Sequence, residues 1–202
     1  MQAVKVPTVD SNSGKSIENL LNGIGSAIPK AKFASAKTPL EISKHNPAAL
    51  YEYLSDFRKM LNSENKILKW TAIDVIANIS VADPKKLTPK LFQKLLLLLT
   101  DNKSMITSGH VIDNLGKIAK AKPSLSIAIT KELLGLENSE RNQECKNILL
   151  GKTIIVFQQY FEYIENKGDA IDFVERQLHN SRNATSHKAK AFLSAMKQRS
   201  DD

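Results

Sequence analysis

The stretch that comes nearest to a chemical motif is VDSNSGKS at residues 9–16, which ends as a phosphate-binding loop does. A P-loop needs a glycine at its first position, where this chain has Val9. It also needs a buried strand in front, but MQAVKVPTV is a poor strand and no βαβ pattern follows. We therefore expect a flexible tail over 1–15, with Ser16 capping a helix, and no nucleotide cofactor.

Histidines and paired carboxylates are the other residues that could do chemistry, and they are scattered. His179 and His187 could approach each other across a hairpin, but no carboxylate or cysteine lies at ligand spacing beside them. We therefore expect no metal site. The paired carboxylates fit solvated helix faces better than acid–base catalysis: Glu162 with Glu165, and Asp169 with Asp172. We expect no catalytic residues and no cofactor.

The composition of the chain indicates which kinds of partner and which cellular compartment to expect. The 202 residues are 42% hydrophobic and carry a formal net charge of +8, which favours an acidic partner. Cys145 is the single cysteine and is interpreted as a packing residue, so an intramolecular disulfide is excluded and a reducing compartment, the cytoplasm, is expected. The first 16 residues contain no signal-like apolar run, and no window approaches the roughly 18 apolar residues of a membrane span. We expect no membrane association.

A turn recurs along the chain and points to internal repeats. The segments MLNSENK, LTDNKSM, LENSERN and LHNSRNA each place Asn or Asp two residues after an apolar residue. These positions are 39, 37 and 42 residues apart: Asn62, Asp101, Asn138 and Asn180. A period of this length is typical of stacked helical hairpins.

The residues after two of these turns also match. AIDVIANISVADP at 72–84 aligns with VIDNLGKIAKAKP at 111–123 at an offset of 39. Apolar residues three and four apart indicate helices, and each closing proline can end one helix and open the next.

The predicted layout is all-α. An amphipathic helix before Pro29 and a loop over KFASAKTP form an N-terminal cap at 16–46. Repeats follow at 47–83, 84–122, 123–167 and 168–198, with paired helices over 47–61 and 65–81, 84–99 and 103–121, 124–136 and 141–165, and 169–179 and 183–197. TIIVF at 153–157 favours a strand in isolation, but its setting in a long helical pattern predicts helix.

At residues 95–119, LLLLLTDNKSMITSGHVIDNLGKIA resembles a HEAT repeat, and similar units cover about three quarters of the chain. The resemblance implies a right-handed α-α superhelix, a HEAT-like solenoid of about four helical hairpins with an N-terminal helical cap. Two features depart from the family. The arginine usual early in the second helix is missing at Leu68-Lys69, Thr107-Ser108, Glu144-Cys145 and His187-Lys188, and the third repeat's second helix runs long, to residue 165.

Five consecutive leucines, Leu95 to Leu99, end the first helix of the second repeat. Five positions at about 100° each pass right around a helix, so no single face could bury them. A middle helix of a stacked array contacts its own partner and both neighbouring repeats. We therefore expect the block to be core, in which case Leu97→Asp should unfold the middle of the array; the alternative is an exposed apolar patch that binds a partner.

Basic residues outnumber acidic ones on the four second helices, which line the concave face in the family that the chain resembles. The candidate binding residues on this face are Lys66, Lys69, Lys103, Lys117, Lys120, Lys146, Lys152, Lys188 and Lys190. We expect a non-catalytic scaffold that binds a protein partner on this face. The alternative is nucleic-acid binding in a layout like that of the HEAT-like alkylpurine glycosylases, for whose groove residues only Trp70 and Asp113 are loose counterparts. An unrecognised enzyme is the third possibility.

Overall fold

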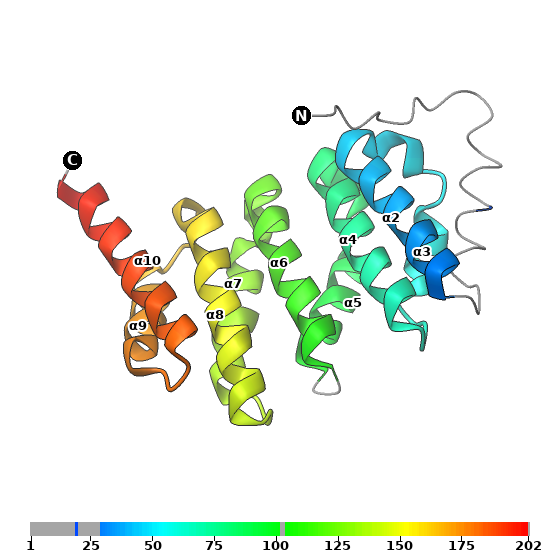
Figure 1. The fold of residues 1–202 in the computed structure, drawn as a ribbon. Coiled ribbons are helices and arrows are strands. Elements are labelled where there is room, and N and C mark those ends of the chain that lie inside the picture. Colours follow the sequence, from blue (N-terminus) through cyan, green and yellow to red (C-terminus); the bar gives the residue numbers. More distant parts are fainter. Residues whose placement is uncertain (1–18, 20–28, 102–103, 202) are drawn as a thin grey trace, which may run out of the picture. The chain divides into compact units, whose positions relative to one another are not determined.

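The computed structural model describes residue 19, residues 29–101 and residues 104–201, and every regular element in those ranges is helical (Figure 1). The prediction of an all-α helical-repeat fold is thus confirmed. The P-loop-like stretch at 9–16 and the helix expected before Pro29 lie outside the described residues. Within the described ranges, none of the helices has the length and apolar character needed to cross a membrane.

The chain divides into two compact units, Met1–Ile79 and Ser80–Asp202. The helices of the first unit are α2 (Pro29–His45), the short 3-10 helix η1 (Pro47–Leu50), α3 (Leu54–Met60) and α4 (Lys66–Ala82), whose last three residues pass into the second unit. The helix predicted over 47–61 is therefore wrong as a single element, because the backbone of Tyr53, with φ −91° and ψ 3°, interrupts it between η1 and α3.

Helix α2 corrects the loop predicted over KFASAKTP, because it continues through Pro39. The alanines and lysines before this proline are good helix formers, and a proline removes only one backbone donor. Ala36, Pro39 and Ser43 are buried at helical spacing, so packing of this face offsets the lost hydrogen bond. The Ser43 hydroxyl accepts a hydrogen bond from Asn78 Nδ2 of α4 at 2.9 Å and donates to the Leu40 carbonyl.

The second unit is a series of antiparallel helical hairpins. Its α-helices are α5 (Pro89–Thr100), α6 (Met105–Ala121), α7 (Ser126–Leu134), α8 (Gln143–Tyr160), α9 (Lys167–Arg176) and α10 (Asn183–Asp201). Single turns of 3-10 helix flank them: η2 (Pro84–Lys86), η3 (Pro123–Leu125), η4 (Gly135–Asn138), η5 (Phe161–Tyr163) and η6 (Gln177–His179). Side chains cap the N-termini of α5, α6, α8 and α9: Thr88, Ser104, Asn142 and Asn166.

The predicted period is visible in the helix bounds. Helices α4 and α6 have 17 residues each, and both ends of α6 lie 39 positions after those of α4. Buried polar residues keep the same spacing through the second unit, at Ser108, Asn147 and Ser186. Ser108 Oγ donates to the Leu99 carbonyl at 2.9 Å, and Ser186 Oγ donates to the Leu178 carbonyl at 2.7 Å. Each serine thus ties a second helix to the end of its own first helix.

The leucine block is mostly core, as predicted, with one exception. Leu95, Leu96, Leu98 and Leu99 are buried, whereas Leu97 is 56% exposed. The prediction that Leu97 is core is therefore wrong, and a charge at this position is not expected to unfold the array. A helix in this stack buries most of its circumference but still has one solvent-facing line, and Leu97 lies on it.

Helix α8 ends at Tyr160, so the long third-repeat helix predicted to residue 165 is also wrong. The Tyr160 hydroxyl and Thr130 Oγ1 of α7 form a buried hydrogen bond of 2.9 Å, and burial raises the pKa of Tyr160 well above its usual value. Beyond it, Phe161 packs edge-on against Phe192 of α10. These contacts turn the chain into η5. The TIIVF segment is helical, as predicted.

Candidate functional site

Three second helices of the second unit lie side by side, with α8 between α6 and α10 (Figure 1). Glycines bring these helices close together. A Cβ at Gly151 of α8 would lie 2.7 Å from Thr185 Oγ1 of α10, closer than real contacts allow. Thr185 cannot easily move away, because its hydroxyl donates to the Asn147 carbonyl at 2.8 Å. The spacing of α8 and α10 is therefore set by the absence of a side chain.

Arg141, just before α8, fixes the helix to the preceding turn. Its guanidinium donates to the Leu99 carbonyl at 3.0 Å, the Asp101 carbonyl at 2.9 Å and Ser108 Oγ at 2.8 Å. Burial lowers the pKa of Arg141, and the nearby Asp101 opposes this. This arginine links two successive repeats, and it does so from the turn before α8 rather than from within the helix.

Lys152 of α8 makes an ion pair across the α6–α8 interface. Its aliphatic stem lies against Gly109 of α6, where an added Cβ would be 3.2 Å from Lys152 Cε. Its ammonium donates to Asp113 Oδ2, one turn beyond that glycine on α6. The glycine, the aspartate and the lysine together define what we call the paired site.

Lys188 of α10 repeats this arrangement across the α8–α10 interface, without the carboxylate. Its stem lies against Gly151, with Cδ 3.6 Å from the position of a Cβ there. The residue four positions after this glycine, the spacing of Asp113 from Gly109, is Ile155, which is 41% exposed. Gly151, Ile155 and Lys188 are called the open site.

The Lys188 ammonium has no hydrogen-bond or ion-pair partner among the residues that the structure describes. Burial lowers its pKa, and the positive charges of Lys152 and Arg182 lower it further, with Asp113 opposing them. Arg182 is itself paired, since its Nε donates to Glu144 Oε1 at 3.0 Å. The open site therefore holds one cation that this part of the chain leaves unneutralised.

The structure brings together only some of the predicted lysines. Lys152 is close enough to Lys188 for its positive charge to lower the pKa of Lys188. Lys190 is exposed, whereas Lys152 and Lys188 are half-buried, and it lies about 200° around α10 from Lys188, on another side of the helix. Lys117, whose ammonium donates to Asn114 Oδ1, and Lys120 are exposed near the C-terminal end of α6.

The remaining predicted lysines lie elsewhere. Lys146 is half-buried in the first turn of α8. Lys66 and Lys69 are on α4 in the first unit, and Lys103 lies outside the described residues. The residues that the prediction omitted are Arg182, Gly151 and Ile155. A signal for the last two exists, because GHVID at 109–113 and GKTII at 151–155 share their glycine and isoleucine spacing and differ at the last position.

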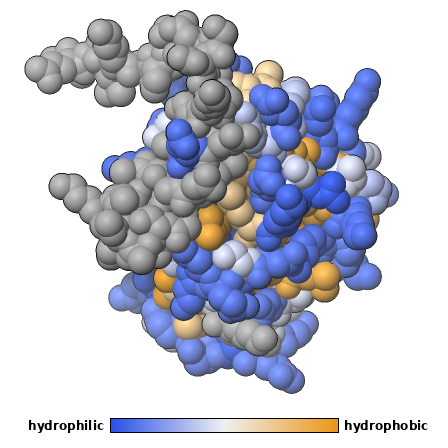
Figure 2. All heavy atoms as spheres, turned by 90° about the vertical axis from the view of Figure 1, so that its right-hand side faces the viewer, coloured by the Kyte–Doolittle hydropathy of each residue, from blue (hydrophilic) through white to orange (hydrophobic). Residues whose placement is uncertain are grey.

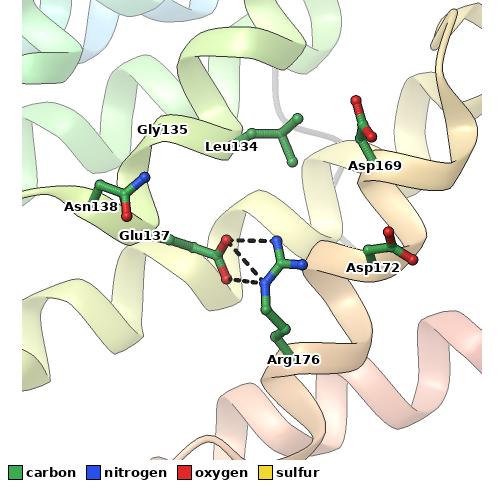
Figure 3. A pocket seen from close by; sticks show the side chains of 7 residues that line it. All are labelled: Leu134, Gly135, Glu137, Asn138, Asp169, Asp172 and Arg176. Atoms are coloured by element: carbon green, nitrogen blue, oxygen red, sulfur yellow. Dashed lines mark hydrogen bonds and ion pairs between the residues drawn. The ribbon is translucent and has the colours of Figure 1, made fainter.

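The first helices carry a separate pocket of about 310 Å³ (Figure 3). Its lining residues are Leu134, Gly135, Glu137, Asn138, Asp169, Asp172 and Arg176. Arg176 donates to both carboxylate oxygens of Glu137, at 2.7 Å from Nη2 to Oε2, and this pairing raises the pKa of Arg176. Asp169 and Asp172 are exposed on α9, in agreement with the solvated face predicted for them.

Other candidate groups are solvent-facing or isolated. His179 and His187 are exposed, and Cys145 is half-buried at the start of α8. In the described ranges, no three His, Cys, Asp or Glu side chains lie close enough to hold a metal ion. Of the aromatic residues, Phe157, Tyr160 and Phe161 are buried, Trp70 is half-buried and Tyr163 is 42% exposed.

Exposed apolar side chains are few and separate. On the face drawn in Figure 2, hydrophilic side chains predominate and hydrophobic ones are scattered among them. The large apolar side chains that stay exposed in the described residues are Val81, Leu97, Ile106, Ile127, Ile155 and Tyr163. Single exposed apolar residues are ordinary on protein surfaces, so Ile155 matters because of what lies beside it.

Comparison with known proteins adds little. No protein-family model and no curated protein sequence matches the chain. Among solved structures, it is similar to an engineered protein from the Northeast Structural Genomics Consortium, with 17% identity and a TM-score of 0.49 over 86% of this chain and 76% of that one. A likeness of that degree carries no information on function.

Proposed function

We propose that the chain is a non-catalytic helical-repeat scaffold that binds a protein partner through the α6, α8 and α10 face. The observation that supports this most is the open site, where Lys188 has no ion-pair partner among the described residues and Ile155, one helical turn along α8 from Gly151, is 41% exposed. A cation next to an exposed apolar side chain, on closely packed helices, suits recognition of a protein surface. The resemblance to HEAT repeats, whose second helices line a concave surface, favours the same face.

Nucleic-acid binding is the second candidate, favoured by the cation cluster and the net charge of +8. Two features weigh against it. Only five of the 29 basic residues are arginines, and Phe157, Tyr160 and Phe161 are buried, so their rings are not available to stack on bases. Asp113, the loose counterpart of a glycosylase groove residue, is held in an ion pair with Lys152.

Site-specific photo-crosslinking in the native cell tests the proposal. A photoreactive amino acid replaces Ile155 in one variant and Ile127, a more exposed isoleucine on α7, in the control. We expect the variant at 155 to form adducts that protease removes and nuclease does not, and the control to form none of them. Adducts at 127 alone, or adducts that nuclease removes, would contradict binding of a protein on this face.

A further inference from the structure

The paired site shows what the open site lacks. Across the α6–α8 interface, a lysine stem crosses a glycine and its ammonium is neutralised by the carboxylate one turn further on, Asp113. Across the α8–α10 interface, Gly151 lies against Thr185 and against the stem of Lys188, and the residue four positions after this glycine is Ile155. A lysine stem therefore lies against a glycine at both interfaces, and among the described residues only Lys152 forms an ion pair with a carboxylate.

The neighbouring charges define what the open site can accept. Lys152 is neutralised by Asp113 and Arg182 by Glu144, so both carry carboxylates already. Lys188 lies within electrostatic reach of both cations and gains from any added negative charge. The site therefore has room, in charge terms, for one carboxylate rather than for a run of phosphates.

Ile155 adds an apolar element to this charge. It follows Lys152 by three positions and Gly151 by four, so it is on the same side of α8 as both. At 41% exposure it leaves apolar area that a partner side chain could cover. A carboxylate alone would satisfy Lys188, whereas a carboxylate next to an apolar side chain would also cover Ile155.

We propose that Lys188 and Ile155 form a seat for an acidic segment of a partner protein, which contributes one carboxylate to the Lys188 ammonium and one apolar side chain to Ile155. This inference rests on the proposed function and names the chemistry of the partner. The partner carboxylate takes the role at Lys188 that Asp113 takes at Lys152. A phosphate of nucleic acid is an outcome of the test rather than the proposed occupant.

Selection from a random-sequence peptide display library provides the test. The full chain is the bait, and the enriched peptides are synthesised and measured against wild type, Lys188→Gln and Lys131→Gln. Lys131 is exposed in the last turn of α7, on a first helix, which makes it the matched control. Circular dichroism verifies that each variant is folded, and a nonspecific duplex DNA is titrated in parallel.

The proposal predicts that the Lys188 ammonium and the peptide's carboxylate contribute to the binding affinity through each other. Enriched peptides should contain Asp or Glu beside an apolar residue, and Lys188→Gln should weaken binding about tenfold, the effect of one charge pair. Changing the peptide's acidic residue to its amide should weaken binding to the wild-type protein by the same factor. The same amide peptide should bind the Lys188→Gln variant no more weakly than the acidic peptide binds that variant. Lys131→Gln should bind as wild type does.

The contrary outcomes separate the inference from the function on which it rests. If the peptides crosslink at position 155 but bind without an acidic residue, or are indifferent to Lys188→Gln, the acidic seat is wrong while the protein-binding face stands. If no peptide binds this face, or if duplex DNA binds it with steep salt dependence and displaces the peptides, both proposals fail.

Discussion

The α6–α8 and α8–α10 interfaces each pack a lysine stem against a glycine, but they differ in whether the lysine is paired with a carboxylate. Each has a glycine that lets a lysine stem cross the neighbouring helix, at Gly109 with Lys152 and at Gly151 with Lys188. Lys152 is paired with Asp113, one turn beyond Gly109, whereas the residue at that spacing from Gly151 is Ile155. The first interface is closed by its own residues, and the second leaves a cation whose pKa is lowered by burial and by like charges.

The difference between the two interfaces shows where a charged side chain lowers the stability of the folded state. A partly buried lysine beside two other cations is unfavourable for folding, and a nearby carboxylate would relieve it. Groups that are unfavourable for stability yet built into an ordered surface are candidates for function. The paired site serves as an internal reference for what a merely structural lysine looks like.

The largest effect is expected where the two interfaces differ in their turn arginines. Arg141→Met removes the donors to two carbonyls and to Ser108 Oγ, and should lower the free energy of unfolding by about 2–3 kcal/mol. Arg182→Met removes one exposed ion pair, to Glu144, and should cost at most about 1 kcal/mol. Urea denaturation of both variants measures this, and equal losses would refute the distinction.

The second-largest difference in stability is expected between alanine variants of the two glycines. Gly151→Ala places a Cβ against Thr185, which is held by its hydrogen bond to Asn147, and should destabilise by about 1–2 kcal/mol despite the better helix propensity of alanine. Gly109→Ala meets only the flexible stem of Lys152, which can shift, and should change stability by less than about 1 kcal/mol in either direction. Thermal unfolding compares them, and a larger loss at Gly109 would reverse the expected order.

The smallest effect on stability is expected at Lys188. Lys188→Met keeps the stem over Gly151 and removes the charge, so the free energy of unfolding at pH 7 should stay within about 0.5 kcal/mol of wild type, on the stabilising side. Because the lowered pKa penalises the charged folded form, the gain should be present below that pKa and fade as the pH rises toward the ordinary value of 10.5. A clear loss of stability at pH 7 would mean that the charge has an internal partner after all.

Much of the fold follows from periodicity, and the exceptions have local causes. Helix α6 and the buried side chains at Ser108, Asn147 and Ser186 follow the period of 39 that the turns and their flanks reveal. Pro39 was misleading because proline usually ends a helix, whereas here burial of its face keeps α2 continuous. Leu97 could not be assigned to solvent from its neighbours, since which line of a helix stays exposed depends on the packed array.

The candidate site was predicted less well, because counting lysines on helices ignores direction. Lys188 and Lys190 are two residues apart and face different sides of α10, and only the first meets α8. The paired ion Asp113–Lys152 could have been found, since its members are 39 residues apart, one repeat period. The unneutralised state of Lys188 could not, because it depends on which side chains the α8–α10 interface brings near.

Measuring peptide affinity for the Ile155→Asp variant tests the central claim most directly, because it gives the open site the carboxylate that the paired site has. The new Asp should neutralise Lys188 from within the chain, as Asp113 neutralises Lys152. We predict that the acidic peptides selected on wild type lose about tenfold in affinity, while the free energy of unfolding is unchanged or higher. Undiminished peptide binding by this variant would contradict the account.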